Sequence, residues 1–427
     1  MYYYKIDEQQ LVSDDPIMIL NGFKIESLNH FKRTFLVFNK PHYKGKQYFK
    51  ITPSFTSLEA YESVEWLMCP QKNQISEELR ILSDRELLSG LNINTWIEQL
   101  STKEVDQIII GFKGFIAEVT ALDTGKKRIH LLGLGDVGST LAIGLKLLGG
   151  ELIHTLGVYD INAHQRRRYE MELNQIIVNP EIKVEALNID DLFHCDVFVF
   201  CASKYVPKVG EIVADVRMIQ FEENSKIIEI YAKMARSLGF KGLFCVVSDP
   251  VDLLCRRVFE SSNTNEKGEY DGLGMSVERI RGFGLGVMHG RSFYYAKKLG
   301  IEYATNGRVF GPHGKDLICV NHITKYDHEA SLRLTESVIH ANIDVREEGF
   351  KPYIAPAISS GAKSILDAIS GNWHYSATCM GTTFFGALNR QTIAGIEYEQ
   401  NTLDDPLGKR IMASYERLES LWQELKS

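Results

Sequence analysis

From residue 128 onward, the chain alternates short apolar runs with longer segments of helical pattern. The apolar runs of strand length cover residues 128–132, 153–159, 182–187, 196–202, 242–248 and 281–284. Between several of them lie helical patterns such as 137–148 and 217–236. Near-continuous apolar strands separated by helices are typical of a parallel sheet that is covered on both faces. The sequence therefore predicts an α/β fold with a doubly wound parallel sheet.

Length, charge and cysteine content restrict the class of protein further. At roughly 150 residues per domain, 427 residues predict two or three domains. The chain has 48 Lys and Arg against 55 Asp and Glu, and this acidic excess offers no basic face for nucleic acid. No apolar run approaches the ~18 residues of a membrane span, and the first residues lack a signal-peptide pattern. Seven cysteines without a Cys-x-x-Cys pair indicate reduced thiols, no metal site and a cytoplasmic location.

A glycine-rich turn follows the first of these apolar runs and opens a helical pattern. It contains Gly133, Gly135 and Gly138 in a G-x-G-x-x-G spacing. The first glycine permits the tight turn, the second lets the backbone approach a pyrophosphate, and the third lets the helix pack closely on the strand. A pyrophosphate would then face the backbone amides at the start of the helix, where Asp136 and Val137 lie. The turn therefore predicts a dinucleotide site.

An acidic residue ends the next predicted strand. Asp160 lies 22 residues after Gly138, where a carboxylate can accept hydrogen bonds from ribose hydroxyls and repel a 2′-phosphate. This position favours NAD over NADP, although the nearby Arg166 and Arg168 act against that preference. The alternative interpretation is a tight turn and a surface acid in a similar fold that binds no nucleotide.

These patterns predict three domains. Residues 1–127 combine β-rich pieces at 2–6, 16–20, 34–38 and 47–52 with a helical segment at 56–67, and we expect a small accessory α+β domain. The polar segment 121–127 is typical of a boundary. Residues 128–270 would then form the NAD-binding Rossmann domain. Residues 271–427 would form an α+β catalytic domain, whose C-terminal run 407–425 has helical spacing and is expected to pack on the domain.

Four further motifs follow the glycine-rich turn. They are VFVFCAS, which ends at Ala202 and Ser203; VVSDPVDLL, which contains Ser248; IRGFGLGVMHGR; and RVFGPHGKD. Over residues 128–427 their order and spacing resemble the lactate/malate dehydrogenase family, whose last three motifs read S-N-P-V-D, V-I-G-x-G-x-x-L-D-S-A-R and V-x-G-E-H-G-D-S. The resemblance implies an NAD-dependent oxidoreductase of small 2-hydroxy or 2-oxo acids, usually a homodimer or homotetramer. It also implies cofactor contacts at Ala202, Ser203 and Ser248.

The resemblance assigns roles to three side chains. His313 matches the family's catalytic histidine, which exchanges a proton with the substrate oxygen. Arg291 matches the arginine that grips the substrate carboxylate with a planar fork. Arg217 matches a loop arginine that polarises the substrate carbonyl, but six residues separate it from Gly210 where the family has two. The alternatives are a turn histidine and two surface arginines.

The chain departs from the family at the partner of the catalytic histidine. The family's Asp, which stabilises the protonated imidazole and fixes its tautomer, corresponds here to Met288. Asp249, at the family's Asn position in SDPVD, is the candidate to replace it. It could hold His313 as an imidazolium, or donate a proton to the substrate oxygen itself. The alternative is that Asp249 caps the helix that begins at Pro250.

Nearby charges and other functions leave alternatives open. Lys204, Lys208 and Lys351 lie near pocket positions of the family and could meet a second carboxylate or a phosphate, or could be solvated loop charges. His289 could act as a proton relay. A catalytically weakened NAD(H)-binding sensor is the main alternative function. A related NAD enzyme such as an imine dehydrogenase or a metal-dependent glycosidase is a third, but Cys201 is expected to be a buried apolar residue rather than a metal ligand.

Overall fold

The computed structural model describes residues 125–204, 216–271, 273–275, 277–392, 395–399 and 401–426. In the N-terminal part it describes residues 2–6, 9–13, 25–27, 34–37, 48–52, 64–67 and 92–93. The predicted piece at 16–20 and most of the predicted helix at 56–67 lie outside these residues. Among the described helices, none combines the length and the apolarity that crossing a membrane requires.

The described N-terminal segments form a six-stranded sheet with the order β3-β1-β2-β4-β5-β6. Its strands are β1 (Tyr2–Ile6), β2 (Gln9–Ser13), β3 (Ile25–Ser27), β4 (Thr34–Val37), β5 (Tyr48–Thr52) and β6 (Asn92–Ile93). A short 3-10 helix, η2 (Val64–Leu67), lies at the end of the predicted helix. Its residues Val64 and Leu67 are buried in the same hydrophobic cluster as the C-terminal helix α10 (Asp405–Lys426).

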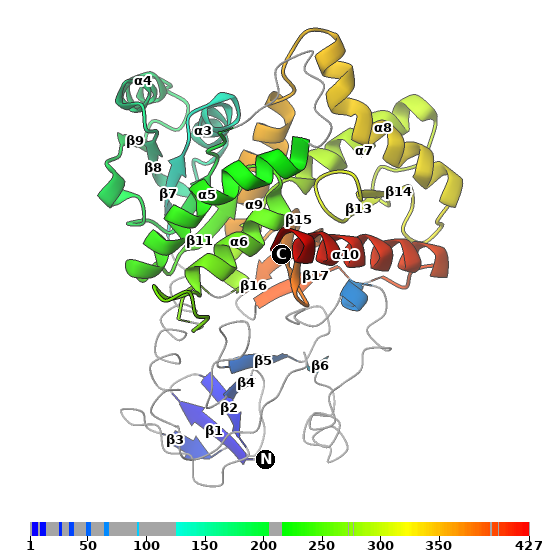
Figure 1. Cartoon of the computed structure of the whole chain (residues 1–427), viewed down its shortest axis with the longest axis horizontal. Coiled ribbons are helices and arrows are strands. Elements are labelled where there is room, and N and C mark those ends of the chain that lie inside the picture. The colour runs from blue at the N-terminus through cyan, green and yellow to red at the C-terminus, as the bar shows by residue number, and fades with distance from the viewer. Residues whose placement is uncertain are drawn as a thin grey trace.

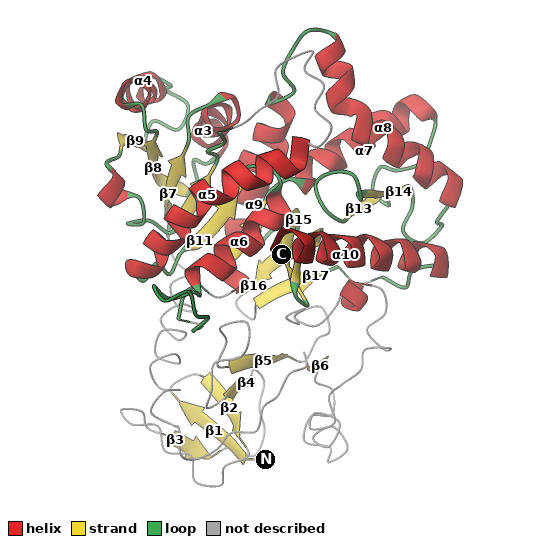
Figure 2. Ribbon diagram, viewed as in Figure 1, coloured by secondary structure: helices red, strands yellow, loops and turns green. Residues whose placement is uncertain are grey.

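A nine-stranded sheet forms the centre of the remaining chain, with the order β17-β16-β15-β12-β11-β10-β7-β8-β9 (Figures 1 and 2). Its parallel strands are β7 (Lys127–Leu132), β8 (Ile153–Tyr159), β9 (Lys183–Ala186), β10 (Val197–Phe200), β11 (Leu243–Val246) and β12 (Ile280–Gly282). The strands β15 (His374–Met380), β16 (Thr383–Thr392) and β17 (Gly395–Tyr398) continue it antiparallel. All six apolar runs therefore form strands, each within two residues or so of the predicted ends.

Helices cover both faces of this sheet, which confirms the doubly wound architecture. One hydrophobic cluster includes residues of α3 (Asp136–Leu148) and α4 (Ala163–Asn174), with the π-helix η7 (Pro356–Lys363) and α9 (Ser364–Ile369). The other includes residues of α5 (Val216–Ser237), α6 (Val251–Ser262) and α10. Along β10, Val197 and Val199 belong to the first cluster, and Phe198 and Phe200 to the second, because successive side chains of a strand point to opposite faces.

The elements beyond β12 position the second half of the site. Helix α7 (Leu285–Leu299) follows β12 directly, and α8 (His328–Glu347) lies beside it, on the right in Figure 1. A two-stranded ribbon, β13 (Arg308–Phe310) and β14 (Ile318–Val320), encloses the segment that carries the GPHGKD motif. The buried Trp422 of α10 packs edge-on against Phe221 of α5, so the C-terminal helix packs on the domain as predicted.

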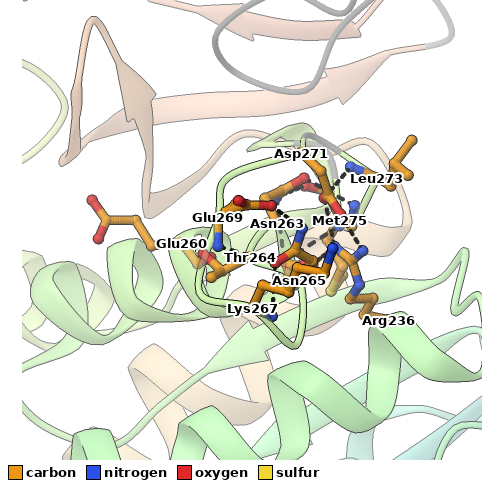
Figure 3. A network of polar contacts seen from close by, with 12 residues as sticks. Arg236, Glu260, Asn263, Thr264, Asn265, Lys267, Glu269, Asp271, Leu273 and Met275 are labelled. Atoms are coloured by element: carbon orange, nitrogen blue, oxygen red, sulfur yellow. Dashed lines mark hydrogen bonds and ion pairs between the residues drawn. The ribbon is translucent and has the colours of Figure 1, made fainter.

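A polar network fixes the loop between α6 and η6 (Val277–Arg279), where the predicted domain boundary lies (Figure 3). Arg236 of α5 donates from Nη1 and Nη2 to the two carboxylate oxygens of Asp271, at 2.7 and 2.5 Å. The buried Asn263 donates to the carbonyl of Met275 and accepts from the amide of Gly274. The central sheet continues across residue 270, because β11 pairs with β12, and the domain boundaries stay predictions.

Candidate active site

The glycine-rich turn is built by close approach of three backbone segments. Gly133 has a φ of +95°, and a Cβ atom there would lie 2.7 Å from the backbone nitrogen of Ala202. At Gly138, a Cβ atom would lie 1.8 Å from the carbonyl oxygen of Gly133. Both positions therefore require glycine for packing, as the sequence predicted for the first and third members of the motif.

The middle glycine has a different environment. Gly135 is the N-cap of α3 without a side-chain cap bond, and a Cβ atom there would have nothing within 4 Å. The space beside the start of α3 is therefore open at the positive end of the helix. Backbone amides in such a position suit a pyrophosphate. The turn thus fits the dinucleotide that the motif predicted.

Asp160 lies at the end of β8 beside this turn. Its Oδ2 accepts from the amide of Leu134 at 2.8 Å, and its Oδ1 accepts from the amide of Asn162 at 2.9 Å. The carboxylate is therefore held at the edge of the turn, with lone pairs left for further donors such as ribose hydroxyls.

The arginines that follow Asp160 make contacts elsewhere. Arg166 donates from Nη1 to the carbonyl of Leu187 at 2.9 Å, and its guanidinium lies 5.1 Å from the ring centre of Tyr159. Arg168 forms an ion pair with Glu172 one turn further along α4. Both arginines are engaged along α4 and its neighbours, so this arrangement favours NAD over a 2′-phosphorylated dinucleotide.

A buried asparagine that the sequence reasoning missed joins the loops at the carboxyl ends of β10 and β11. Asn224 of α5 donates to the carbonyl of Asp249 at 2.8 Å and accepts from the amide of Lys204 at 3.0 Å. It also donates to Ser203 Oγ at 3.3 Å, and Ser248 Oγ donates to the carbonyl of Ala202 at 2.8 Å. The only signal in the sequence is a polar residue on the apolar face of the 217–236 pattern.

His313 and Asp249 come together in the structure. His313 Nδ1 lies 2.7 Å from Asp249 Oδ1, and the side chains are 12% and 46% exposed, so the carboxylate is open to a substrate while the ring is sheltered. The His313 amide donates to the buried Asp252 of α6 at 3.1 Å, a second contact that the sequence reasoning missed. Gly284 is required here, since a Cβ atom on it would lie 2.7 Å from Cβ of His313.

The helix-capping alternative for Asp249 is wrong. Helix α6 begins at Val251 with Pro250 as its N-cap, and no side chain caps it. Asp249 therefore lies one residue outside the helix, and its side chain points to His313 instead.

Arg291 lies close to this pair. It is half-buried on α7, where Nη2 donates to Asn342 Oδ1 of α8 at 2.5 Å and Nη1 lies 3.8 Å from the sulfur of Met288. Burial lowers the pKa of the Arg291 guanidinium, and the negative charge of the neighbouring Asp249 acts in the opposite direction. Asp249 thus contacts His313 directly and acts on Arg291 through its charge. Arg291 is not the solvated surface arginine of the alternative interpretation.

Met288 packs into the protein rather than toward the histidine. It is 3% exposed and belongs to a hydrophobic cluster with Leu285, Val287 and Tyr303. His289, the proposed relay, forms a hydrogen bond between its Nδ1 and the hydroxyl of Tyr303 at 2.8 Å. Burial lowers the pKa of His289 to about 4. Met288 and His289 are therefore both packed among residues of α7 and its neighbours.

The remaining charged candidates differ in position. Arg217 is the second residue of α5, and its side chain and Lys208 lie outside the described part. Lys204 forms an ion pair with Glu223 at 2.5 Å. Lys351 forms one with Asp136 at 2.7 Å, which links the segment before η7 to the first residue of α3. Asp136 thus offers its amide to a cofactor while its side chain binds this lysine.

Comparison with known proteins identifies the fold and the cofactor. The family model described as lactate/malate dehydrogenase, NAD binding domain, matches residues 127–269. The L-lactate dehydrogenase of Borrelia hermsii is 24% identical over 262 residues, which are 57% of this chain and 77% of that protein. The L-lactate dehydrogenase 2 of Peribacillus psychrosaccharolyticus is 28% identical over 191 residues, 44% of this chain and 54% of that protein.

Solved structures share the fold. The malate dehydrogenase of Cryptosporidium parvum superimposes with a TM-score of 0.58 at 18% identity. The superposition covers 71% of this chain and 99% of that protein. The malate dehydrogenase of Archaeoglobus fulgidus, solved in complex with NADH, gives 0.57 at 16% identity, with 70% of this chain covering all of that one. Residues 127–269 accordingly match the NAD-binding domain of lactate/malate dehydrogenases, which gives NAD as the cofactor, and the chain shares the fold of the solved malate dehydrogenases.

Proposed function

We propose that this protein is an NAD-dependent oxidoreductase that transfers a hydride between nicotinamide and a small 2-hydroxy or 2-oxo acid. The observation that carries the proposal is the contact of Asp249 with His313, with Arg291 as a further neighbour of the same carboxylate. This arrangement supports an acid-base role for His313 and a carboxylate-binding role for Arg291.

The three side chains divide the chemistry between them. NAD supplies or accepts the hydride when it is bound. In the direction of reduction, His313 gives a proton to the oxygen that the hydride transfer leaves negative, and it regains a proton from solvent. Asp249 holds Nδ1 and stabilises the imidazolium, which is the task of the carboxylate that Met288 replaces. Arg291 binds the substrate carboxylate through two of its N–H groups.

Arg217 is proposed as the loop arginine that polarises the substrate carbonyl. The backbone supports this only to the extent that Arg217 lies in the first turn of α5, directly after residues 205–215.

A sensor that binds NAD(H) without turnover is the second candidate, and the buried Met288 at the family's carboxylate position favours it. The two functions differ in one measurable respect. Both predict NADH binding, whereas only the dehydrogenase predicts that added 2-oxo acids oxidise bound NADH.

The test measures NADH binding by calorimetry and NADH oxidation with a panel of 2-oxo acids, for the wild type, His313→Gln and Arg291→Gln. We expect NADH affinity to persist in both variants, while kcat/KM falls about 100-fold or more in each. His194→Gln is the matched control, because His194 is exposed and precedes β10 at the opposite end of the sheet. NADH binding without turnover across the panel would favour the sensor, and absence of NADH binding would overturn both.

We also propose that the protein forms a homodimer or homotetramer. Phe293 and Tyr294 of α7 are 56% and 53% exposed, and Ile343 of α8 is 49% exposed, so apolar surface is available on two neighbouring helices. Light scattering at micromolar concentration should give at least twice the mass of one chain. A Phe293→Asp variant should give a lower mass, and a monomeric wild type would contradict the proposal.

A further inference from the structure

The clamp arginine has a partner on the neighbouring helix that is uncharged. Asn342 of α8 accepts a hydrogen bond from Arg291 Nη2 through its Oδ1 at 2.5 Å. Both side chains are half-buried, and the guanidinium also contacts the thioether of Met288. A neutral oxygen can hold the guanidinium in place without cancelling the charge that a substrate carboxylate needs.

The next contact between the same two helices shows that the choice of an amide is specific to Arg291. Tyr295, one turn along α7, donates its hydroxyl to Asp344 Oδ2 of α8 at 2.5 Å. The neutral phenol is therefore matched with a carboxylate, and the cationic guanidinium is matched with an amide. With Asp at position 342, the arginine would be neutralised by an ion pair within its own protein.

An unrestrained arginine side chain would have to be ordered each time substrate binds. Arg and Lys lose rotamer entropy when they are fixed, and a hydrogen bond in the free protein removes part of that penalty from binding. The contacts with Asn342 and Met288 use two of the five N–H groups of Arg291, so three are left for a bidentate contact with a carboxylate.

We propose that Asn342 is a positioning residue that holds Arg291 in the orientation that binds the substrate carboxylate. The inference rests on the proposed function, in which Arg291 is the clamp. Asn342 contributes to substrate affinity through Arg291 and makes no contribution to NAD binding, because its contact is with α7 and not with the glycine-rich turn.

The test compares Asn342→Ala and Asn342→Asp with the wild type. The measured quantities are KM and kcat for the 2-oxo acid that the panel identifies as best, inhibition by oxamate, and calorimetric Kd for NADH. We expect Asn342→Ala to raise KM and the oxamate inhibition constant about tenfold. Asn342→Asp should raise both about 100-fold or more, because the new carboxylate competes with the substrate. The NADH Kd should stay within about twofold in both variants.

Tyr295→Phe is the matched control, since it removes a hydrogen bond between the same helices without touching Arg291. A purely structural role for Asn342 would lower Tm and leave KM at the Tyr295→Phe value, which would overturn the proposal. Unchanged KM in Asn342→Asp would do the same. If Arg291→Gln itself leaves KM and kcat unaltered, the proposed function fails; if Arg291→Gln is impaired and Asn342→Ala is not, only the role of Asn342 fails.

Discussion

Asp249 Oδ1 lies 2.7 Å from Nδ1 of His313, although 64 positions separate the two residues in the chain. The carboxylate comes from the loop between β11 and α6, whereas the family pattern places it on α7, where this chain has the buried Met288. The partner of the histidine has therefore moved to a different element, while its distance still suits a charge-assisted hydrogen bond.

This relocation can be tested by exchanging the two positions. Asp249→Asn should lower kcat/KM about 100-fold, because no carboxylate then holds the imidazole ring through Nδ1. The double variant Asp249→Asn with Met288→Asp restores the family pattern and should recover about tenfold or more. Circular dichroism and NADH titration check that the buried substitution folds. A double variant no more active than Asp249→Asn would show that position 288 cannot supply the carboxylate.

Substitutions of two glycines in the nucleotide turn should have different effects, one on the stability of the fold and the other on cofactor affinity. Gly138→Ala brings a methyl group within 1.8 Å of the Gly133 carbonyl, and we expect at least about 3 kcal/mol lower stability in urea unfolding. Gly135→Ala meets no atom within 4 Å, so stability should change by no more than about 1 kcal/mol. Its NADH Kd should nevertheless rise about tenfold or more, because the methyl group fills the space beside the α3 amides. Equal NADH affinity in Gly135→Ala and the wild type would contradict this use of the turn.

Asp160 should control the choice between the two dinucleotides. Asp160→Asn keeps an oxygen that accepts from a backbone amide, but it removes the charge that repels a 2′-phosphate. The ratio of NADPH to NADH affinity should rise about tenfold in titrations that follow cofactor fluorescence. Asp190→Asn, an exposed change in the short 3-10 helix η5 (Ile189–Asp191), should leave the ratio unaltered. A ratio that does not move in Asp160→Asn would remove Asp160 from cofactor selection.

The Arg236–Asp271 contact in Figure 3 should make stability depend on acid pH. Its hydrogen bonds with Arg236 hold the pKa of Asp271 below the usual value of a carboxyl. The folded-state pKa is then lower than the unfolded one, so this stabilisation is complete above the unfolded pKa of about 4 and is lost as pH falls through the folded value. In urea unfolding, Asp271→Asn should be less stable than the wild type at pH 7, and the difference should shrink toward pH 3. A difference that stays constant over this range would exclude the ion pair as its cause.

The strands and the nucleotide turn could be predicted because their signals are local. A strand buried on both faces is a continuous apolar run, and the three glycines of the turn follow one another within six positions. Trp422 and its helix were likewise visible as a periodic pattern. Strands β10 and β11 are shorter than the apolar runs that predicted them, because strand pairing stops where the chain turns into the loops of the site.

The contacts of Asn224, Asp252, Gly284 and Asn342 could not be predicted in this way. Each acts on a residue far away in the chain: Asn224 on the loop of Asp249, and Asn342 on Arg291 across two helices. The sequence around a single polar residue in a helix does not show whether its side chain is solvated or bonded to a residue in another element. Local amino-acid order thus determined the α/β architecture and the dinucleotide turn, since backbone geometry and apolar periodicity act between near neighbours. Only the packing of α6, α7 and the β13–β14 ribbon decided which carboxylate meets His313, because that meeting depends on where distant segments come to lie.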